Sequence, residues 1–221
     1  MSRSRQEAKS QASIDQALSK ALSLFSNQGF GATSMRQIAE ESGLSVGNLY
    51  HHFGSKEAIF QRLLNDYWKG LQKEDHPLRR LYEKADFPED LEKMAEVIEK
   101  VIEDNSEHIL LFYVDVIEFR GQHIRAFYKV MAREFKRVYG KKLEARRQAG
   151  EIGDVDALSA VIMATRWFFY FYTVEKCFQM PNHFGMDPKL AVKEFIRLLR
   201  LGLLPRSEPP NLGMGFDPEV K

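Results

Sequence analysis

Apolar residues recur at helical spacing along most of the chain. Between residues 5 and 28 they follow i, i+3 and i+4 positions, and Gly29 stands where a helix C-terminal cap belongs. Two shorter helices are expected next, one over TSMRQIAEES with Thr33 as its N-cap and one over VGNLYHHF with Ser45 as its N-cap. No segment shows a sustained alternation of apolar and polar residues, so the sequence predicts an all-α fold.

The helical period continues to about residue 204. Ser55 is expected to cap a connecting helix over residues 55–78, and glycine or proline marks the later boundaries. The further helices are predicted over about residues 88–106, 107–119, 121–149, 154–180 and 187–204. Residues 205–221 are rich in proline and glycine, and we expect a disordered tail there. The pattern therefore predicts a small N-terminal domain over residues 1–54, a larger helical domain over residues 55–204, and this tail.

Composition narrows the class of protein further. The chain has 221 residues, of which 44% are hydrophobic, so it can bury a substantial core. Its first ten residues lack the apolar core of a signal peptide, and the most apolar run, residues 161–174, is interrupted by Arg166, so we expect a cytoplasmic protein that does not span a membrane. The single cysteine, Cys177, allows no internal disulfide, and its expected role is that of a small buried hydrophobic residue. The net charge of +1 gives no global indication of a nucleic-acid partner.

The two short helices and the tight turn between them have the proportions of a helix-turn-helix. Ala39 is small enough for the helices to cross closely, and Gly43 suits the backbone of the turn. Leu44, Leu49 and Phe53 are placed to enter a three-helix core. The residues left facing outward are Ser45, Val46, Gly47, Asn48 and His51, with Tyr50 at the edge.

This outward face suits DNA. A helix in the major groove presents its first residues to the base edges, where Gly47 would let the backbone approach and Val46 could touch a thymine methyl group. Hydroxyl, imidazole and cationic groups around it suit phosphate oxygens. The phosphate candidates are Thr33, Arg36, Tyr50, His51 and Lys56, and Arg36 could instead reach a guanine.

Two other interpretations of this stretch fit less well. Adjacent histidines on a helix point about 100° apart, so His51 and His52 would need a different spacing and a further ligand to hold a metal ion. The glycines of GLSVG lack the lysine and the spacing of a phosphate-binding P-loop. We therefore predict no metal site and no cofactor here, and we expect His52 to pack at the rim of the helix.

The run from Ala21 to Leu64, ALSLFSNQGFGATSMRQIAEESGLSVGNLYHHFGSKEAIFQRLL, resembles the DNA-binding domain of TetR-family transcriptional repressors at nearly every motif position. The resemblance implies a homodimeric repressor with a helical ligand-binding body, whose last two helices form a four-helix bundle with those of the partner. It implies base-facing roles for Arg36, Val46 and Gly47. It implies phosphate contacts for Thr33, Asn48, Tyr50, His51 and Lys56.

The larger domain contains most of the aromatic residues. Six of them are consecutive in WFFYFY, so they surround their helix, and such a helix must be covered on every side. With the resemblance, residues 154–180 and 187–204 become the dimer helices, with Phe195, Leu198, Leu199 and Leu201 as further interface candidates. The resemblance also implies a small-molecule pocket, for which the candidates are Phe112, Tyr113, Val116, Phe119, Phe127, Met131, Trp167 and Phe171, with Arg120, His123 or Arg166 as polar anchors. A pocket of this composition would suit an apolar anion such as an acyl-CoA.

No catalytic arrangement emerges from the sequence. Asp115 and Glu118 are three residues apart on one helix face, but we expect a solvated or salt-bridged pair, with Arg120 or Arg125 nearby, and not a pair of catalytic carboxylates. No nucleophile, base and orienting group assemble, so we predict no enzyme. Two alternatives remain open: a transcriptional activator of the same fold, and a helical lipid-binding or enzymatic protein whose N-terminal helices are only structural.

Overall fold

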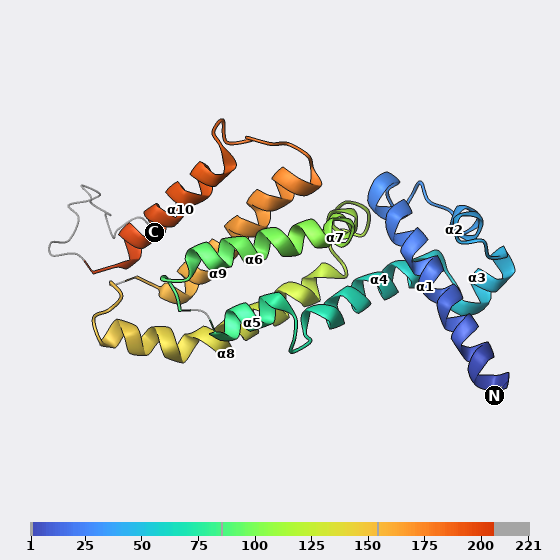
Figure 1. The fold of residues 1–221 in the computed structure, drawn as a ribbon, viewed down its shortest axis with the longest axis horizontal. Helices are drawn as coiled ribbons and strands as arrows, with labels where there is room; N and C mark the ends of the chain where they lie inside the picture. The colour runs from blue at the N-terminus through green and yellow to red at the C-terminus, as the bar shows by residue number, and fades with distance from the viewer. Residues whose placement is uncertain (1, 85, 154, 206–221) are drawn as a thin grey trace, which may run out of the picture.

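The computed structural model describes residues 2–84, 86–153 and 155–205, with side chains from residue 7 onward. Within these ranges the chain forms ten α-helices and one π-helical turn and contains no strand, which confirms the predicted all-α class. The molecule is elongated, with helices α1 to α3 at one end and α5 to α10 forming the rest, and α4 runs between the two parts (Figure 1). We call residues 2–53 the head and residues 77–204 the body.

The head consists of α1 (Ser2–Gln28), α2 (Met35–Ser42) and α3 (Val46–Phe53), within a few residues of the predicted helices. The predicted N-cap of α2 is wrong by one residue, because Ser34 occupies that position. The Ser34 hydroxyl accepts a hydrogen bond from the Gln37 backbone N–H, and the Gln37 side chain accepts one from the Ser34 N–H. These reciprocal bonds form a capping box, which satisfies two amides at the start of the helix. Ser45 caps α3 as predicted.

The predicted connecting helix over residues 55–78 ends earlier, at Leu71, as α4 (Lys56–Leu71), and a helix that was not predicted, α5 (Pro77–Lys84), follows it. Pro77 begins α5, a position where proline loses no hydrogen bond because the first amides of a helix have no partner within it. The His76 ring Nδ1 accepts a hydrogen bond from the Leu78 backbone N–H and so satisfies one of those amides. The break lets the chain change direction and brings α5 alongside α6, with which it makes contacts.

The remaining helices follow the predicted order with slightly shorter bounds. They are α6 (Leu91–Asp104), α7 (Ser106–Glu118), α8 (Ile124–Gln148), α9 (Ala157–Tyr172) and α10 (Pro188–Leu203), with a π-helical turn (Thr173–Cys177) directly after α9. The predicted tail lies almost entirely beyond residue 205, outside the described residues.

Helix α9 is the central helix of the body. By length and composition the segment Ala157–Cys177 could cross a membrane, but 56% of its most apolar window is buried inside the protein. It packs against α6, α8 and α10, and Val161, Ala164 and Phe168 are fully buried. The apolar character of this segment is therefore explained by its place in the core of the body.

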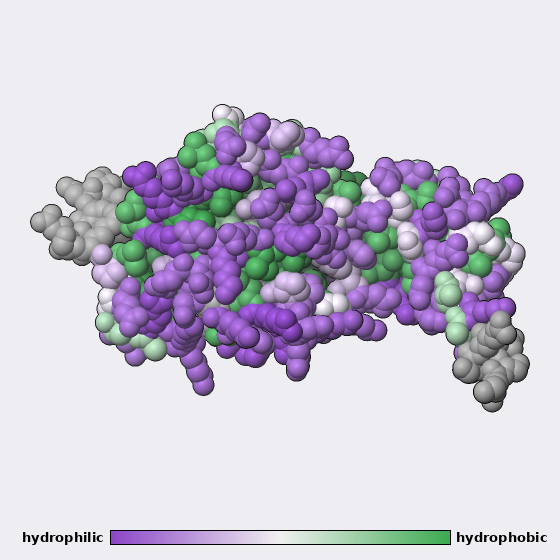
Figure 2. Space-filling view, in the orientation of Figure 1, coloured by the Kyte–Doolittle hydropathy of each residue, from purple (hydrophilic) through white to green (hydrophobic). Residues whose placement is uncertain are grey.

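Two hydrophobic cores divide the molecule within α4. The first half of α4 contributes Ile59, Phe60, Leu63 and Leu64 to the core of the head, whereas Tyr67 belongs to the core of the body. The predicted domain boundary at residue 54 separates helices, but the packing changes from one core to the other about ten residues later. Polar side chains cover most of the face seen in Figure 2, and apolar patches appear between the helices of the body.

Candidate nucleic-acid interface and effector cavity

Helix α3 is held to the head by its apolar side and presents its first turn to solvent. Leu49 is fully buried, while Val46 and Tyr50 are 37% and 50% exposed. The Ser45 hydroxyl accepts a hydrogen bond from the Asn48 backbone N–H at 3.1 Å, which fixes the start of the helix. The outward residues predicted from the sequence, Ser45 to Gly47 and His51, are all exposed, and Asn48 is half-buried.

Packing within the protein does not explain the glycine at position 47. A Cβ added to Gly47 would meet nothing within 4 Å. Glycine within a helix costs about 1 kcal/mol relative to alanine, so its presence here calls for another reason. Close approach of a second molecule to the first turn of α3 supplies one, and this is the approach a recognition helix makes in the major groove.

The two histidines of α3 lie in different surroundings. His51 is exposed, whereas His52 is half-buried, and their ring centroids are 5.5 Å apart. Among the residues that the structure describes, no three His, Cys, Asp or Glu side chains gather in a group that could hold a metal ion. The exposed His51 remains a candidate phosphate contact, as does Tyr50 beside it.

Two of the predicted phosphate contacts have bonds inside the head. Thr33 is 2% exposed, and its hydroxyl donates a hydrogen bond to the Gly29 carbonyl at 2.8 Å. The Lys56 ammonium group donates to the carbonyl oxygens of Phe30, at 2.7 Å, and Thr33, at 2.5 Å. It also lies 4.2 Å from the centroid of the Phe30 ring. Thr33 therefore fixes the loop between α1 and α2, and Lys56 ties the start of α4 to that loop.

Arg36 stands exposed on α2. Its Nε donates to the Glu40 carboxylate at 2.8 Å, and this hydrogen bond raises the pKa of the guanidinium. An exposed pair of this kind contributes little to stability. Glu40 can therefore release Arg36 to a DNA phosphate or a guanine at small cost.

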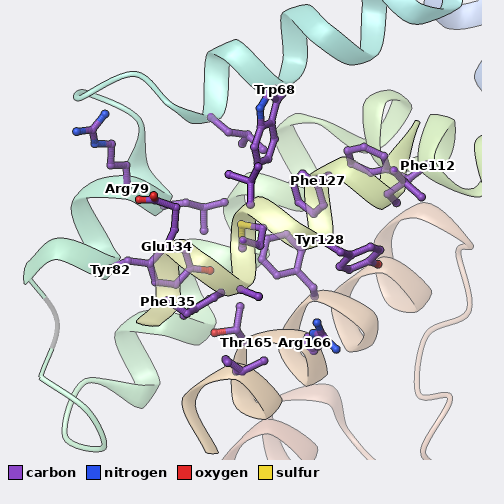
Figure 3. A pocket seen from close by; sticks show the side chains of 18 of the residues that line it. Trp68, Arg79, Tyr82, Phe112, Phe127, Tyr128, Glu134, Phe135, Thr165 and Arg166 are labelled. Carbon is purple, nitrogen blue, oxygen red and sulfur yellow. The ribbon is translucent and has the colours of Figure 1, made fainter. Parts of the chain in front are cut away.

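The body encloses a cavity of about 940 Å³ between α4, α5, α7, α8 and α9 (Figure 3). Most of its wall is aromatic or aliphatic, as expected for a site that takes a small molecule. Six of the predicted pocket residues line it: Phe112, Tyr113, Val116, Phe127, Met131 and Arg166.

The other five predicted pocket residues lie elsewhere. Phe119 packs between the head and α4, with its ring stacked 4.8 Å from Phe60. His123 lines a separate, smaller cavity of about 110 Å³. Trp167 stacks on Phe195 at 3.8 Å and Phe171 is buried beside it, so both belong to the packing of α9 on α10. Arg120 is an exposed residue in the loop after α7 with φ of +53°.

Sequence reasoning missed the walls that α4 and α5 contribute. Tyr67 and Trp68 line the cavity from α4, and Leu78, Arg79 and Tyr82 line it from α5. The apolar stripe of α4 was visible in the sequence, but its pattern does not show whether a residue faces a core or a hollow. Helix α5 was not predicted at all, so its residues could not be considered.

The cavity contains polar groups at distinct places. The hydroxyl oxygens of Tyr82 and Tyr139 are buried and have no hydrogen-bond partner among the described residues. Burial raises the pKa of both phenols, so they stay protonated. The Arg166 guanidinium lies 5.5 Å from the Tyr128 ring centroid on an exposed part of α9 and pairs with no carboxylate in the described part of the chain. The cavity thus offers neutral hydroxyl groups in its interior and a cation near its edge.

A carboxylate at the end of α7 joins the body to the head. Glu118 accepts hydrogen bonds from the backbone N–H groups of Phe30, at 2.8 Å, and Gly31, at 2.6 Å. φ at Gly29 is +87°, which favours glycine, and a Cβ there would lie 2.8 Å from the Glu118 carboxylate, so that side chain would have to shift. We call this contact the Glu118 clamp.

The prediction that Asp115 and Glu118 form a solvated or salt-bridged pair is wrong. Asp115 is fully buried and accepts hydrogen bonds from the backbone N–H groups of His123 and Ile124 and pairs with the His123 ring at 2.5 Å. It therefore fixes the turn between α7 and α8, while Glu118 holds the head. The tertiary contacts of the two carboxylates were invisible in a helix-spacing argument.

An apolar surface covers the outer sides of α9 and α10. Met163 and Tyr170 of α9 are 59% and 57% exposed, and Leu198 and Leu201 of α10 are 68% and 53% exposed. Leu190 adds to the same helix at 47%. Of the interface candidates predicted on α10, Leu198 and Leu201 face outward, whereas Phe195 packs inward on Trp167.

Comparison with known proteins supports the division of the chain into a head and a body. Residues 17–63 match the family model for bacterial regulatory proteins of the tetR family. The chain is 42% identical over 53 residues to the transcriptional repressor KstR2 of Mycolicibacterium smegmatis, covering 24% of this chain and 26% of that protein. It is 27% identical over 136 residues to the transcriptional regulator UidR of Escherichia coli strain K12, covering 61% of this chain and 66% of that protein. The alignments thus span about a quarter of one relative and just under two thirds of the other.

Solved structures extend the likeness of fold to the body. GusR of Salmonella enterica has a TM-score of 0.59 at 19% identity, covering 86% of this chain and 95% of that one. The transcriptional regulator FadR of Bacillus subtilis, solved in complex with stearoyl-CoA, has a TM-score of 0.54 at 21% identity, covering 85% of this chain and 97% of that one.

A three-helix head with an exposed helix α3, joined to a helical body with a cavity, is the architecture of helix-turn-helix DNA-binding regulators. Within it, residues 17–63 match the TetR family of transcriptional regulators, as the sequence resemblance predicted.

Proposed function

We propose that the protein is a cytoplasmic, homodimeric repressor that leaves its DNA operator when a small apolar molecule fills the cavity. The observation that carries this proposal is that α4 and α7 each touch both the cavity and the head. Helix α4 lines the cavity with Tyr67 and Trp68 and packs Phe60 into the head. Helix α7 lines it with Tyr113 and Val116 and ends in the Glu118 clamp. A shift of either helix would therefore move the head.

The proposed DNA surface is the first turn of α3 with its neighbours. Val46 and Gly47 would approach the base edges, and Ser45, Asn48, Tyr50 and His51 would contact the backbone. Arg36 would reach a phosphate or a guanine from α2. Thr33 and Lys56 would act indirectly, because their hydrogen bonds position the start of α4 and the loop before α2.

The proposed dimer forms through the exposed apolar surface of α9 and α10. Burial of Met163, Tyr170, Leu198 and Leu201 against a second copy would remove these side chains from water, which favours association. The two heads would then enter successive major grooves about 34 to 36 Å apart on a palindromic operator. A ligand that changes this spacing weakens DNA binding, because it stabilises the form that does not fit.

An apolar anion, such as an acyl-CoA, is the ligand class we propose first. The apolar wall would hold the chain of such a molecule, and Arg166 near the edge of the cavity would meet its charged part. The stearoyl-CoA in the B. subtilis FadR structure shows that a protein of similar fold takes such a ligand. Calorimetric titration with acyl-CoA of several chain lengths tests this choice; no heat and no loss of DNA binding would remove it.

The decisive experiment selects bound sequences from random DNA and then screens compounds for release of the protein. A repressor of this kind should select a palindromic site and bind it with a steep loss of affinity as salt increases. Absence of any selected sequence would favour the alternative of a lipid-binding or enzymatic protein. Transcription from the selected site in the presence and absence of the protein separates a repressor from an activator.

The Glu118 clamp gives a separate test of the coupling. Glu118→Gln places an amide group against one of the two backbone N–H groups, so we expect the clamp to weaken by about 1 kcal/mol. We expect ligand to release this variant from DNA less effectively, while ligand affinity stays unchanged. Ile117→Ala, on the neighbouring and 77% exposed residue, is the matched control. Equal ligand response in Glu118→Gln and the native protein would contradict this route of coupling.

A further inference from the structure

Two tyrosines in the cavity wall have buried hydroxyl groups without a hydrogen-bond partner in the described part of the chain. Tyr139 is 1% exposed, and its ring centroid lies 6.5 Å from that of Tyr82. Both residues line the cavity, and both hydroxyl oxygens lack a partner among the described residues. An unsatisfied buried polar group costs about 1 to 3 kcal/mol, so two of them in one cavity call for an explanation.

The chemistry of these hydroxyls limits what they can bind. Burial raises the pKa of both phenols, with Tyr139 adding to the rise at Tyr82, so each remains a neutral donor. The Thr165 hydroxyl lies close enough to Tyr82 to oppose the rise in the pKa of that phenol, but the Tyr82 hydroxyl has no hydrogen-bond partner among the described residues. The Thr165 hydroxyl already donates to the Val161 carbonyl at 2.8 Å and has only acceptor capacity left. The group therefore presents two donors and one acceptor.

Charge excludes an anion at this end of the cavity. Arg79 pairs with Glu83 at 3.0 Å and Arg137 pairs with Glu134 at 2.7 Å, so these two cationic groups of the cavity wall already have carboxylate partners. Arg166 lies beside Tyr128 and away from Tyr82 in the view of Figure 3. Burying an anion without a cation costs far more than two hydrogen bonds to neutral hydroxyls return. Burial of a neutral oxygen that accepts these hydrogen bonds does not carry this electrostatic cost.

We propose that the ligand carries a neutral oxygen, as a ketone or hydroxyl group, on its apolar part, and that Tyr82 and Tyr139 donate hydrogen bonds to it. Where that oxygen belongs to a hydroxyl group, the Thr165 hydroxyl can accept a hydrogen bond from it. This inference rests on the proposed role of the cavity as the effector site and narrows the ligand class given above. A plain saturated acyl chain would leave both tyrosine hydroxyls without partners.

Matched ketone and hydrocarbon probes test the proposal. Calorimetric titration would compare 9-fluorenone with fluorene, and dodecan-2-one with dodecane, on the full chain. We expect the ketone of at least one pair to bind about tenfold more tightly, as one or two net hydrogen bonds allow. The preference should disappear in the Tyr82→Phe, Tyr139→Phe double variant, which keeps both rings. It should persist in Tyr128→Phe, whose residue lines the same cavity but is 48% exposed.

Thermal unfolding without ligand gives a second readout. If the hydroxyls serve the ligand and not the fold, each tyrosine-to-phenylalanine substitution should leave the Tm unchanged or raise it, because an unsatisfied group is removed. A clear drop in Tm would show that the hydroxyls have structural partners and would overturn the proposal. Failure of both ketones to bind, or equal affinity within both pairs, would overturn it as well.

These outcomes are separable from the proposed function. The operator selection depends on the head and can succeed whatever the cavity binds. Ketone preference without release from DNA would leave the ligand inference standing and remove the effector role. Release from DNA by a plain acyl-CoA, without any ketone preference, would do the reverse.

Discussion

The head and the body are both helical, but they differ in how their helices are capped and packed. In the head and the start of α4, Ser34, Ser45 and Ser55 each cap a helix with a side-chain hydrogen bond, and Phe25, Ile38, Leu49, Ile59 and Phe60 are fully buried. In the body, Asp156 and Asp187 cap α9 and α10, but α6 and α7 begin without a side-chain cap bond, and a cavity of about 940 Å³ separates the helices. The head is therefore closely packed, whereas the helices of the body leave a cavity between them.

Under the proposed function, the difference follows from what each part contacts. DNA has the same groove and backbone everywhere, so a head that docks on it needs particular side chains at fixed places. A ligand-binding body needs only helices around a cavity, and its lining changes with the ligand. This accounts for a family match confined to residues 17–63 beside a fold likeness that covers most of the chain at about 20% identity.

The largest expected effect breaks the core of the head. Phe60→Ala removes a fully buried ring that packs on Phe25 and Phe119, and should lower the free energy of unfolding by about 3 to 5 kcal/mol. Phe127→Ala in the body should cost less than half as much, because Phe127 is only half-buried and already lines a hollow. Urea denaturation of both variants measures the difference. Equal losses would show that the body is packed as closely as the head.

The next effect sharpens the role of the head surface. Tyr50→Phe removes one hydroxyl proposed to contact a phosphate, so affinity for the selected operator should fall by about three- to tenfold. The slope of log K against log salt should not change, because a neutral hydroxyl displaces no counterion. Fluorescence anisotropy at several salt concentrations measures both. Tyr128→Phe, at a tyrosine of the body that lies outside the proposed DNA and dimer surfaces, is the control, and an unchanged affinity for Tyr50→Phe would remove Tyr50 from the interface.

A smaller effect tests the capping of the head. Ser34→Ala removes the hydroxyl that accepts a hydrogen bond from the Gln37 backbone N–H and donates one to the Gln37 side chain, and should cost about 1 kcal/mol of stability. Ser34→Asp keeps an acceptor at the same position and should restore most of that loss. Thermal or urea unfolding measures both variants. If alanine and aspartate behave alike, Ser34 does not cap α2 in solution.

The smallest effect concerns pH and the body. Burial against Tyr67 lowers the pKa of His108 below its ordinary value of 6.5, although Glu107 opposes the shift. The unfolded chain then binds more protons than the folded protein below pH 6.5, so this contribution to stability is complete above that pH and is lost as the pH falls towards the folded-state pKa. His108→Gln should flatten the decline of Tm between pH 7 and pH 5. His51→Gln, at an exposed position of α3, should leave that decline as it is.

The sequence was most informative where function depends on local features. The three helices of the head, the capping role of Ser45 and the outward face of α3 follow from helical spacing, polar caps and glycine positions within a few residues of one another. Errors arose where two local signals compete. Thr33 and Ser34 are both good N-caps, and only the fold decides that Thr33 turns inward to the Gly29 carbonyl.

The cavity was predicted only in part, for a physical reason. Helical periodicity tells which side of a helix is apolar but not whether that side meets another side chain or a hollow. Tyr113 and Phe127 line the cavity, whereas Phe119 and Phe171, which look the same in sequence, pack elsewhere. Because helix α5 was not predicted, Tyr82 could not be considered as a lining residue.

The sequence by itself determined the all-α class, the helix-turn-helix and the family, because these depend on residues close together in the chain. Only the tertiary structure decided that Glu118 reaches the loop at Phe30 and that Lys56 turns inward to the same loop. It alone placed Tyr82 and Tyr139, each with a buried hydroxyl that has no partner among the described residues, in the wall of one cavity. Such contacts join residues that are from 26 to 88 positions apart, and their distances depend on how whole helices pack, which no local pattern records.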